Sequence, residues 1–387
     1  MTLLVTVTGK DQPGVTARLM DVLTAAGASV SDVEQVVVHG RLLLGVVING
    51  EGSGQDVRAA LVAALPSMDL EFTPLEDDEV VRTQVRHHVT VLAAPLRPAA
   101  LAAVTRRLAQ CGANIERVVR LSSYPATAYE LIVAGGDTTR LRAELALEAV
   151  AQSVDVAVEP ASLYRRARRL VVMDVDSTLV QGEVIEMLAA EAGCEAEVAR
   201  VTTAAMAGEL DFEASLRARV RLLEGLPVEA VDRVRAAVRL TPGARTLVRT
   251  LKRLGYAVGI VSGGFTAVTD DLVSGLGLDH ALANVLEVVD GHLTGRVVGA
   301  VVDRAGKADA LRLFAAAEGL TMAQTVAIGD GANDLDMLEA AGLGIAFNAK
   351  PLVREAADAA LSVPWLDTVL YLLGITREEV EAADAQT

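Results

Sequence analysis

Hydrophobic and polar residues in the first quarter of the chain follow two different periods. Leu3 to Thr8 alternates with the period of a half-buried strand, whereas Val15 to Ala26 has apolar residues at helical spacing and stops at Gly27. The predicted elements in order are strand 3–8, helix 15–26, strands 30–38 and 41–48, helix 55–65 and strand 70–74. This order is βαββαβ, and it predicts a ferredoxin-like sandwich over residues 1–76.

The same order recurs in the next segment. Its predicted elements are strand 87–92, helix 99–110, strands 114–122 and 127–133, helix 138–151 and strand 154–158. The clearest internal match aligns Leu23–Val30 with Leu108–Ile115, where a helix ends on glycine and a strand begins. An internal repeat of this kind predicts a second ferredoxin-like domain over residues 86–160.

From Leu170 onward short apolar strands alternate with helical segments. The predicted strands are 171–173, 257–261, 325–328 and 344–347. This alternation indicates an α/β fold with a doubly wound parallel sheet over residues 170–364. Residues 183–240 are long, charged and helical in periodicity, which predicts a helical cap inserted after the first strand. Residues 365–387 are predicted to form a C-terminal helix or tail.

A basic cluster lies between the repeats and this third domain, at Arg165, Arg166, Arg168 and Arg169. An anion or nucleic-acid patch is one interpretation of such a cluster. We favour a linker helix whose arginines pair with acidic surface, because the formal net charge is -16 and no aromatic residues interleave the cluster.

Composition narrows the function classes. The chain has 387 residues, of which 52% are hydrophobic and only 3% aromatic, a balance suited to α/β layers. Its negative charge argues against nucleic acid as a partner. Cys111 and Cys194 are the only cysteines, so a reducing compartment fits better than a disulfide framework. The absence of a basic leader and of a membrane-length apolar run leads us to expect a soluble, cytoplasmic protein without a membrane partner.

Asp174 and Asp176 end the first strand of the third domain. Two solvated aspartates before a helix cap are the usual meaning of such a pair. If the two carboxylates are instead buried, such a short separation is tolerated only when one of them is protonated or a cation binds them. Mg²⁺ is a suitable cation because it prefers oxygen ligands. The pair therefore predicts a metal-assisted reaction on an anionic substrate.

Three more polar segments accompany this pair and are predicted to lie at strand ends. They are Ser262-Gly263-Gly264, Lys307, and Gly329-Asp330-Gly331-Ala332-Asn333-Asp334. Each alone is ordinarily a turn or a solvated side chain. Ligands in parallel sheets lie beyond the carboxyl ends of the strands, so the four segments together predict one site.

These four segments resemble the four motifs of the haloacid dehalogenase-like phosphatases, over Leu170 to about Pro364. The resemblance implies that Asp174 is a nucleophile that forms an aspartyl-phosphate and that Asp176 is the general acid and base. It also implies Mg²⁺ bound by Asp174, the Asp176 carbonyl and Asp330, with Asp334 orienting these ligands. Because Mn²⁺ accepts the same oxygen ligands, the ligand set does not distinguish Mg²⁺ from Mn²⁺. The implied phosphate-binding groups are Ser262, Gly263, Lys307 and Asn333.

The cap carries candidates for substrate choice. A phosphorylated amino acid has an ammonium, which Glu183 can bind, and a carboxylate, which suits the planar fork of Arg219. Met206 and Phe212 are expected to close over the site. These stretches resemble the phosphoserine phosphatases within that superfamily, which implies hydrolysis of O-phospho-L-serine to L-serine, the last step of serine biosynthesis. Phosphothreonine or a phosphorylated protein side chain is the alternative substrate.

The turn Lys10-Asp11-Gln12-Pro13-Gly14-Val15 resembles that of ACT domains, which bind small amino-acid effectors. The resemblance implies an effector, such as L-serine, at Asp11, Gly14 and Val15, with Asn114 as the candidate from the second copy. That copy has Pro95-Leu96-Arg97-Pro98 in the matching turn. Such repeats pair edge to edge, so a homodimer is expected. Repeats that serve assembly only, and a regulator with a vestigial phosphatase body, remain alternatives.

Overall fold

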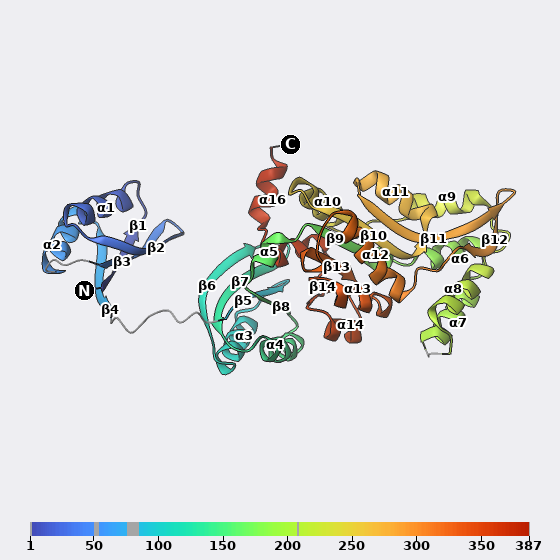
Figure 1. Cartoon of the computed structure of the whole chain (residues 1–387), viewed down its shortest axis with the longest axis horizontal. Coiled ribbons are helices and arrows are strands. Elements are labelled where there is room, and N and C mark those ends of the chain that lie inside the picture. The colour runs from blue at the N-terminus through green and yellow to red at the C-terminus, as the bar shows by residue number, and fades with distance from the viewer. Residues whose placement is uncertain (1, 50–53, 76–84, 207–208, 387) are drawn as a thin grey trace. The chain divides into compact units, whose positions relative to one another are not determined.

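The computed structural model describes residues 2–49, 54–75, 85–206 and 209–386 (Figure 1). The chain divides into two compact units, Met1–Gln84 and Val85–Thr387, and each is described by itself. Within the described ranges, no helix combines the length and the apolar character that crossing a membrane requires.

The first unit is one ferredoxin-like domain. Its elements are β1 (Thr2–Lys10), α1 (Val15–Ala25), β2 (Ser29–Val38), β3 (Arg41–Asn49), α2 (Gly54–Ala64) and β4 (Met68–Leu75). The strands form an antiparallel sheet in the order β2-β3-β1-β4. Alternate residues of β1, such as Val5 and Val7, pack with Leu19 of α1, which is why the period-two and helical patterns meet in one core. The predicted βαββαβ order is confirmed.

The second unit begins with another domain of this kind. Its elements are β5 (Arg86–Ala93), α3 (Pro98–Gln110), β6 (Ala113–Ser122), β7 (Thr127–Gly135), α4 (Thr138–Gln152) and β8 (Asp155–Pro160). The sheet order β6-β7-β5-β8 corresponds to that of the first domain. Helix α5 (Leu163–Ala167) follows. Arg165 pairs with Glu130, and Arg168 pairs with Glu159 at 2.7 Å. Both carboxylates are buried, so these two arginines pair with acidic residues but not with the acidic surface that the sequence predicted.

A seven-stranded sheet forms the body of the third domain, in the order β12-β11-β10-β9-β13-β14-β15. The strands are β9 (Leu170–Asp174), β10 (Ala257–Phe265), β11 (His280–Val289), β12 (His292–Val298), β13 (Thr325–Gly329), β14 (Leu343–Phe347) and β15 (Ala359–Leu361). All neighbouring pairs are parallel except β11 with β12. The predicted doubly wound α/β fold is confirmed.

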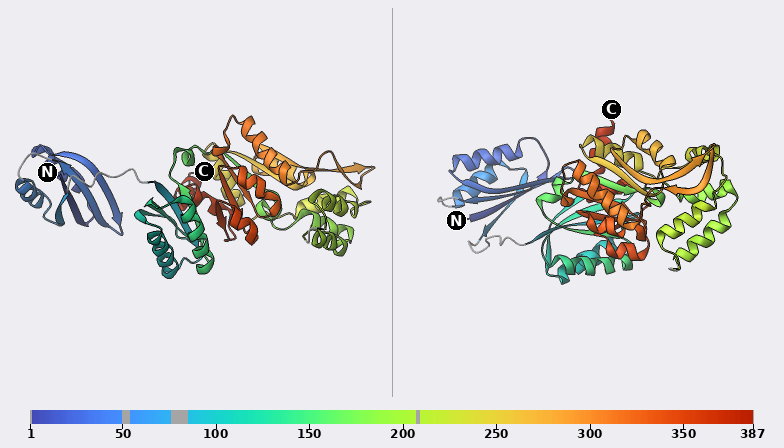
Figure 2. Two further views of the ribbon diagram at one scale, coloured as in Figure 1. Left: turned by 60° about the horizontal axis from the view of Figure 1, so that its bottom comes forward. Right: turned by 45° about the vertical axis from the view of Figure 1, so that its right-hand side comes forward.

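Helices cover both faces of this sheet, as Figure 2 shows. They are α10 (Ala244–Arg253), α11 (Thr266–Leu276), α12 (Arg304–Ala317), α13 (Leu335–Ala340) and α14 (Pro351–Ala356). Val171 belongs to a core with α10 and with the C-terminal α15 (Val369–Leu372), whereas Val172 belongs to a core with α12 and α13. Successive residues of a strand point to opposite faces, so the continuous apolar run of β9 reflects a strand buried on both sides. Helix α16 (Arg377–Asp384) is the last helix of the described residues.

Four helices form the cap after β9: α6 (Val184–Ala192), α7 (Glu195–Met206), α8 (Phe212–Arg221) and α9 (Val228–Ala237). Their core also takes in Leu293 and Val297 of β12, so the cap rests on a β-hairpin of the body. The sequence interpretation missed this hairpin, although its turn is Asp290-Gly291, a standard hairpin signal.

The second ferredoxin-like domain is joined to the body along the outer strand β15. The buried carboxylate of Asp155 on β8 accepts hydrogen bonds from the amide (2.7 Å) and hydroxyl of Ser362. Arg142 of α4 pairs with Asp358 at 2.9 Å, at the other end of β15. These contacts fix the two parts of the second unit to each other.

Candidate active site

The polar segments at the carboxyl ends of β9, β10 and β13 lie at one edge of the body sheet. The prediction that Ser262-Gly263-Gly264 follows its strand is wrong: these residues form a bulge inside β10, which continues to Phe265. These three strands are adjacent and parallel, so their carboxyl ends meet. A cavity of about 750 Å³ lies there. Its lining includes Asp174, Asp176, Glu183, Glu186, Phe212, Arg219, Gly263, Gly264, Arg304, Asp330, Asn333 and Lys350. The structure thus brings body and cap candidates to one space.

Lys307 is fully buried behind this cavity and joins two of its carboxylates. Its Nζ lies 2.6 Å from Asp174 Oδ1 and 2.7 Å from Asp334 Oδ1. Burial opposes the charged amine, yet the two carboxylates raise the pKa of Lys307 above its ordinary value. The prediction that Lys307 follows a strand end is wrong: it lies in the first turn of α12, where the carboxylate of Asp303 caps the helix.

Asp334 holds the loop after β13. Its second oxygen accepts the amides of Asp330 (3.1 Å) and Gly331 (2.9 Å). A side chain at Gly329 would collide with this carboxylate, which explains the small residue at the strand end. Both oxygens of Asp334 are therefore committed to Lys307 and to main-chain amides.

Asp174, Asp330 and Asp334 place one carboxylate oxygen each within 4.8 Å of one another. Burial, followed by the charge of Asp334, raises the pKa of Asp174 well above its ordinary value and that of Asp330 to about 6. One ammonium accompanies three carboxylates, so the cluster has fewer positive than negative groups. Free oxygens of Asp174 and Asp330, together with this charge deficit, fit a hard divalent cation such as Mg²⁺.

Asp176 has hydrogen-bond partners outside this carboxylate cluster. Its Oδ1 accepts the amide of Val184 at 2.8 Å, and its Oδ2 lies 3.3 Å from the hydroxyl of Ser262. Burial raises the pKa of Asp176, which favours a proton on this carboxyl group. Its side chain thus lies between the first residue of α6 and the Ser262–Gly264 bulge of β10.

Gly263 and Gly264 in the Ser262–Gly264 loop leave no room for a side chain, because other side chains lie close to their backbone. A Cβ on Gly264 would lie 2.8 Å from Asp176 Oδ2, and one on Gly263 would lie 2.9 Å from the ring of Phe212. The amide of Gly264 donates to Ser262 Oγ at 2.7 Å. The loop can therefore meet the cap and Asp176 only because it lacks side chains at these positions.

Glu183 and Arg219 are the ionisable cap residues that the sequence singled out. Burial and the charges of Asp176 and Asp330 raise the pKa of Glu183 to about 7. Burial lowers the pKa of Arg219, although Glu183 opposes this shift. Among the described residues, the buried Nε of Arg219 has no hydrogen-bond partner. A half-buried acid and an incompletely paired guanidinium are thus available in the cavity. Met206 ends α7, and its side chain lies outside the described residues.

Three residues at or beside the cavity were not among the candidates chosen from the sequence. Thr178 is buried and its hydroxyl lies 3.3 Å from Asp330 Oδ1. Arg304 lines the cavity while paired with Asp336, and Lys350 lines it from the loop after β14. Lys350 follows a parallel strand of the same sheet, so the strand-end rule that found the other segments would also have found it.

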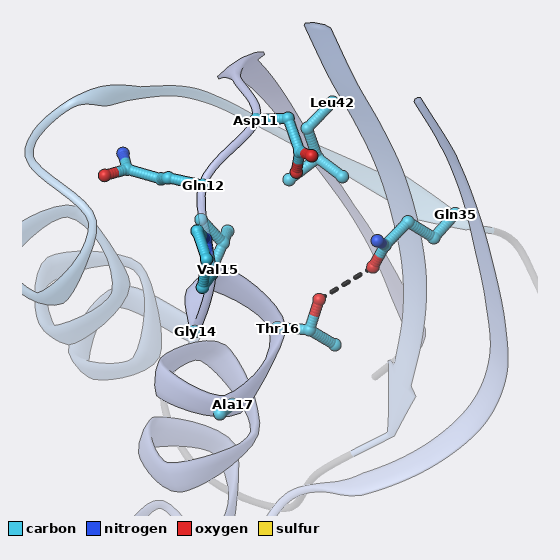
Figure 3. A pocket seen from close by; sticks show the side chains of 9 residues that line it. Asp11, Gln12, Gly14, Val15, Thr16, Ala17, Gln35 and Leu42 are labelled. Atoms are coloured by element: carbon cyan, nitrogen blue, oxygen red, sulfur yellow. Dashed lines mark hydrogen bonds between the residues drawn. The ribbon is translucent and has the colours of Figure 1, made fainter. Parts of the chain in front are cut away.

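A second cavity, of about 310 Å³, lies in the first unit at the turn after β1. Its lining includes Asp11, Gly14 and Val15, the predicted effector residues, together with Gln12, Thr16, Gln35 and Leu42 (Figure 3). Thr16 donates to Gln35 at 2.7 Å across it. Asn114 lies exposed on β6 of the second unit and lines neither of these cavities.

Comparison with known proteins adds family relationships. The haloacid dehalogenase-like hydrolase model matches residues 171–339, and two ACT domain models match residues 1–73 and 85–159. A phosphoserine phosphatase of Streptomyces coelicolor is 62% identical over 99% of this chain and 94% of its own length. Phosphoserine phosphatase SerB2 of Mycobacterium tuberculosis is 52% identical over 100% of this chain and 96% of its own.

Solved structures give the same relationship. An unliganded probable phosphoserine phosphatase from Vibrio cholerae is 36% identical, with a TM-score of 0.59 over 78% of this chain and 89% of that one. A phospho-aspartyl intermediate analogue of a phosphoserine phosphatase is 46% identical, with a TM-score of 0.51 over 53% of this chain and 98% of that one.

Proposed function

The chain belongs to the phosphoserine phosphatases, haloacid dehalogenase-like hydrolases, here with two ACT domains, and we propose that it hydrolyses O-phospho-L-serine to L-serine and phosphate. The observation that carries this proposal is the single cavity that joins Asp174 to Glu183 and Arg219. One small ligand in this cavity can reach Asp174, the nucleophile for phosphorus, and also Glu183 and Arg219, which suit the ammonium and carboxylate of an amino acid. Because the product is L-serine, we assign this reaction to the last step of serine biosynthesis.

The reaction divides into two displacements. Asp174 attacks phosphorus and forms an aspartyl-phosphate, while Asp176 gives its proton to the departing serine oxygen. Water then attacks the same phosphorus, Asp176 takes a proton from it, and phosphate leaves with Asp174 restored. The raised pKa of Asp176 supports the first of these proton transfers.

The phosphoryl group requires positive charge and amide donors. Ser262, the Gly263 amide, Lys307 and Asn333 would hold its oxygens. Mg²⁺, held by Asp174, the Asp176 carbonyl and Asp330, would neutralise charge on the phosphoryl oxygens. Asp334 keeps Lys307 and the loop after β13 in place through the bonds described above.

Substrate choice resides in the cap. Glu183 binds the ammonium of the substrate and Arg219 binds its carboxylate. These contacts select a free amino acid, because a peptide-linked phosphoserine carries neither group. Phe212, whose ring lies against Gly263, and Met206 exclude water from the reacting atoms. Phosphothreonine is the closest competitor for the same contacts.

The ACT domains serve regulation and assembly in this proposal. A small amino acid such as L-serine binds the first-unit cavity at Asp11, Gly14 and Val15. Asn114 is the candidate effector residue of the second ferredoxin-like domain, and the domains pair copies of the chain into a homodimer. A reducing cytoplasm remains the predicted location, since Cys111 and Cys194 are both unpaired. Calorimetry of serine on the full chain and on Asp11→Ala tests the effector part.

Phosphate release from phosphoserine, phosphothreonine and a phosphoserine peptide tests the activity. We expect the highest kcat/KM for phosphoserine, loss of turnover in Asp174→Asn, and loss on metal chelation that Mg²⁺ restores. Asp309→Asn is the matched control, because Asp309 is exposed and lies outside the cavity lining. Unimpaired turnover by Asp174→Asn would overturn the nucleophile assignment, and equal efficiency on the peptide would overturn the substrate class.

A further inference from the structure

Asn284 is a buried polar side chain that none of the preceding roles uses. It lies on β11 with 1% of its surface exposed. Its Nδ2 donates to the carbonyl of Gly263 at 2.8 Å, and its Oδ1 accepts the amide of Val302 at 2.8 Å. One side chain thus connects the Ser262–Gly264 loop, a bulge within β10, to the segment that leads into α12.

The loop needs such a partner because it is a bulge in the sheet. Val261 of β10 pairs with Leu282 of β11, and Phe265 pairs with Asn284, so three loop residues face one residue of β11. Extra residues in a bulge lose their partners in the strand ladder. Asn284 supplies the missing partner for the middle carbonyl.

This bond also orients the Ser262 hydroxyl. The peptide between Gly263 and Gly264 is planar, so holding its carbonyl toward Asn284 directs its N–H to the opposite side. That N–H donates to Ser262 Oγ, which in turn lies 3.3 Å from Asp176 Oδ2. Rotation of this peptide would release the hydroxyl.

The other end of Asn284 acts on the segment that carries Lys307. Val302 immediately precedes Asp303, whose carboxylate accepts the Gly306 amide at 2.8 Å and whose carbonyl accepts the Lys307 amide at 2.9 Å. Asn284 therefore sets the separation between two elements of the site, the Ser262 loop and the first turn of α12.

We propose that Asn284 is a positioning residue for phosphoryl transfer, which holds the Ser262–Gly264 loop and the start of α12 in register. The inference rests on the proposed phosphatase function. Correct placement of the reacting and binding groups contributes large factors to the rate of an enzyme reaction. Displacing such a group by about 1 Å can lower the rate by about a hundredfold.

Two variants test it on the full chain. Asn284→Leu removes both hydrogen bonds, whereas Asn284→Asp keeps an oxygen for Val302 and loses the donor to Gly263. We expect each to lower kcat for phosphoserine by about tenfold to a hundredfold and to weaken competitive inhibition by inorganic phosphate. If the action passes through the loop, Asn284→Leu will have a smaller effect in a Ser262→Ala background than in the wild type.

Val248→Ala controls for lost packing, since Val248 is buried in α10 and does not line the cavity. It should lower the thermal midpoint and leave kcat unchanged. A folded Asn284→Leu or Asn284→Asp variant with wild-type kcat and phosphate inhibition, or multiplicative effects with Ser262→Ala, overturns the inference. Absence of turnover in the wild type would instead overturn the proposed function.

Discussion

Lys307 Nζ lies 2.6 Å from Asp174 Oδ1, and both side chains are buried. The ammonium also contacts Asp334, so it is shared between the proposed nucleophile and the residue that holds the loop after β13. Removing one partner from a buried ionic group leaves an uncompensated charge, which is far more costly than losing a surface pair.

Lys307→Met should therefore abolish phosphatase activity and lower the stability of the folded protein. We expect the free energy of unfolding, measured by urea denaturation at pH 7, to fall by about 3–5 kcal/mol, because two buried carboxylates lose their counter-charge. Lys252→Met is the control: Lys252 pairs with Asp279 while partly exposed, and its loss should cost at most about 1 kcal/mol. Equal losses in the two variants would contradict the assigned role.

Glu183 should make both substrate binding and stability depend on pH. Its pKa is about 7 in the folded chain, against an ordinary value of 4.5. Because the folded pKa is raised, its contribution to stability is present below about pH 4.5 and is lost as pH rises through 7. The urea midpoint of Glu183→Gln should therefore decline less between pH 5 and pH 8 than that of the wild type.

The charged form of Glu183 is the one that binds an ammonium. The KM for phosphoserine in the wild type should accordingly fall as pH rises through about 7, and Glu183→Gln should have a higher KM without this fall. An unchanged pH profile of KM in the variant would exclude Glu183 as the ammonium ligand.

Arg219 should discriminate between substrates with and without a carboxylate. Arg219→Met is expected to raise the KM for phosphoserine by about tenfold to a hundredfold, since a charged hydrogen bond to the substrate is lost. The KM for O-phosphoethanolamine, which lacks the carboxylate, should change little. Arg221→Met, on an exposed position of the same helix, should leave both values unchanged. Equal effects on both substrates would remove Arg219 from carboxylate recognition.

The two ferredoxin-like domains should differ in what their removal does to the phosphatase body. The core of the first ferredoxin-like domain is made of its own residues, so a fragment of residues 85–387 should fold and keep turnover on phosphoserine. A fragment of residues 163–387 should have a lower thermal midpoint, because Ser362 and Asp358 lose Asp155 and Arg142. Equal midpoints for the two fragments would show that these contacts contribute nothing to the body.

Much of the fold follows from local patterns. The period-two run at β1 and the helical spacing at α1 meet in one core, and the repeat of the whole order predicted the second domain. The hairpin of β11 and β12 was missed even though Asp290-Gly291 marks its turn. The short strand β15 was also missed, because its pairing with β14 depends on the sheet and not on its own three residues.

The sequence by itself determined that polar segments follow several apolar strands, and elementary sheet geometry then places those segments at one edge. Only the tertiary structure decided which side chains meet there. Lys307 and Asp174 are 133 residues apart, and their contact depends on strand order and on where α12 begins. The bonds of Asn284 to Gly263 and Val302 likewise depend on a bulge that two strands create together. The residue pattern of one segment does not specify these contacts, because each contact depends on how segments far apart in the sequence pack against one another.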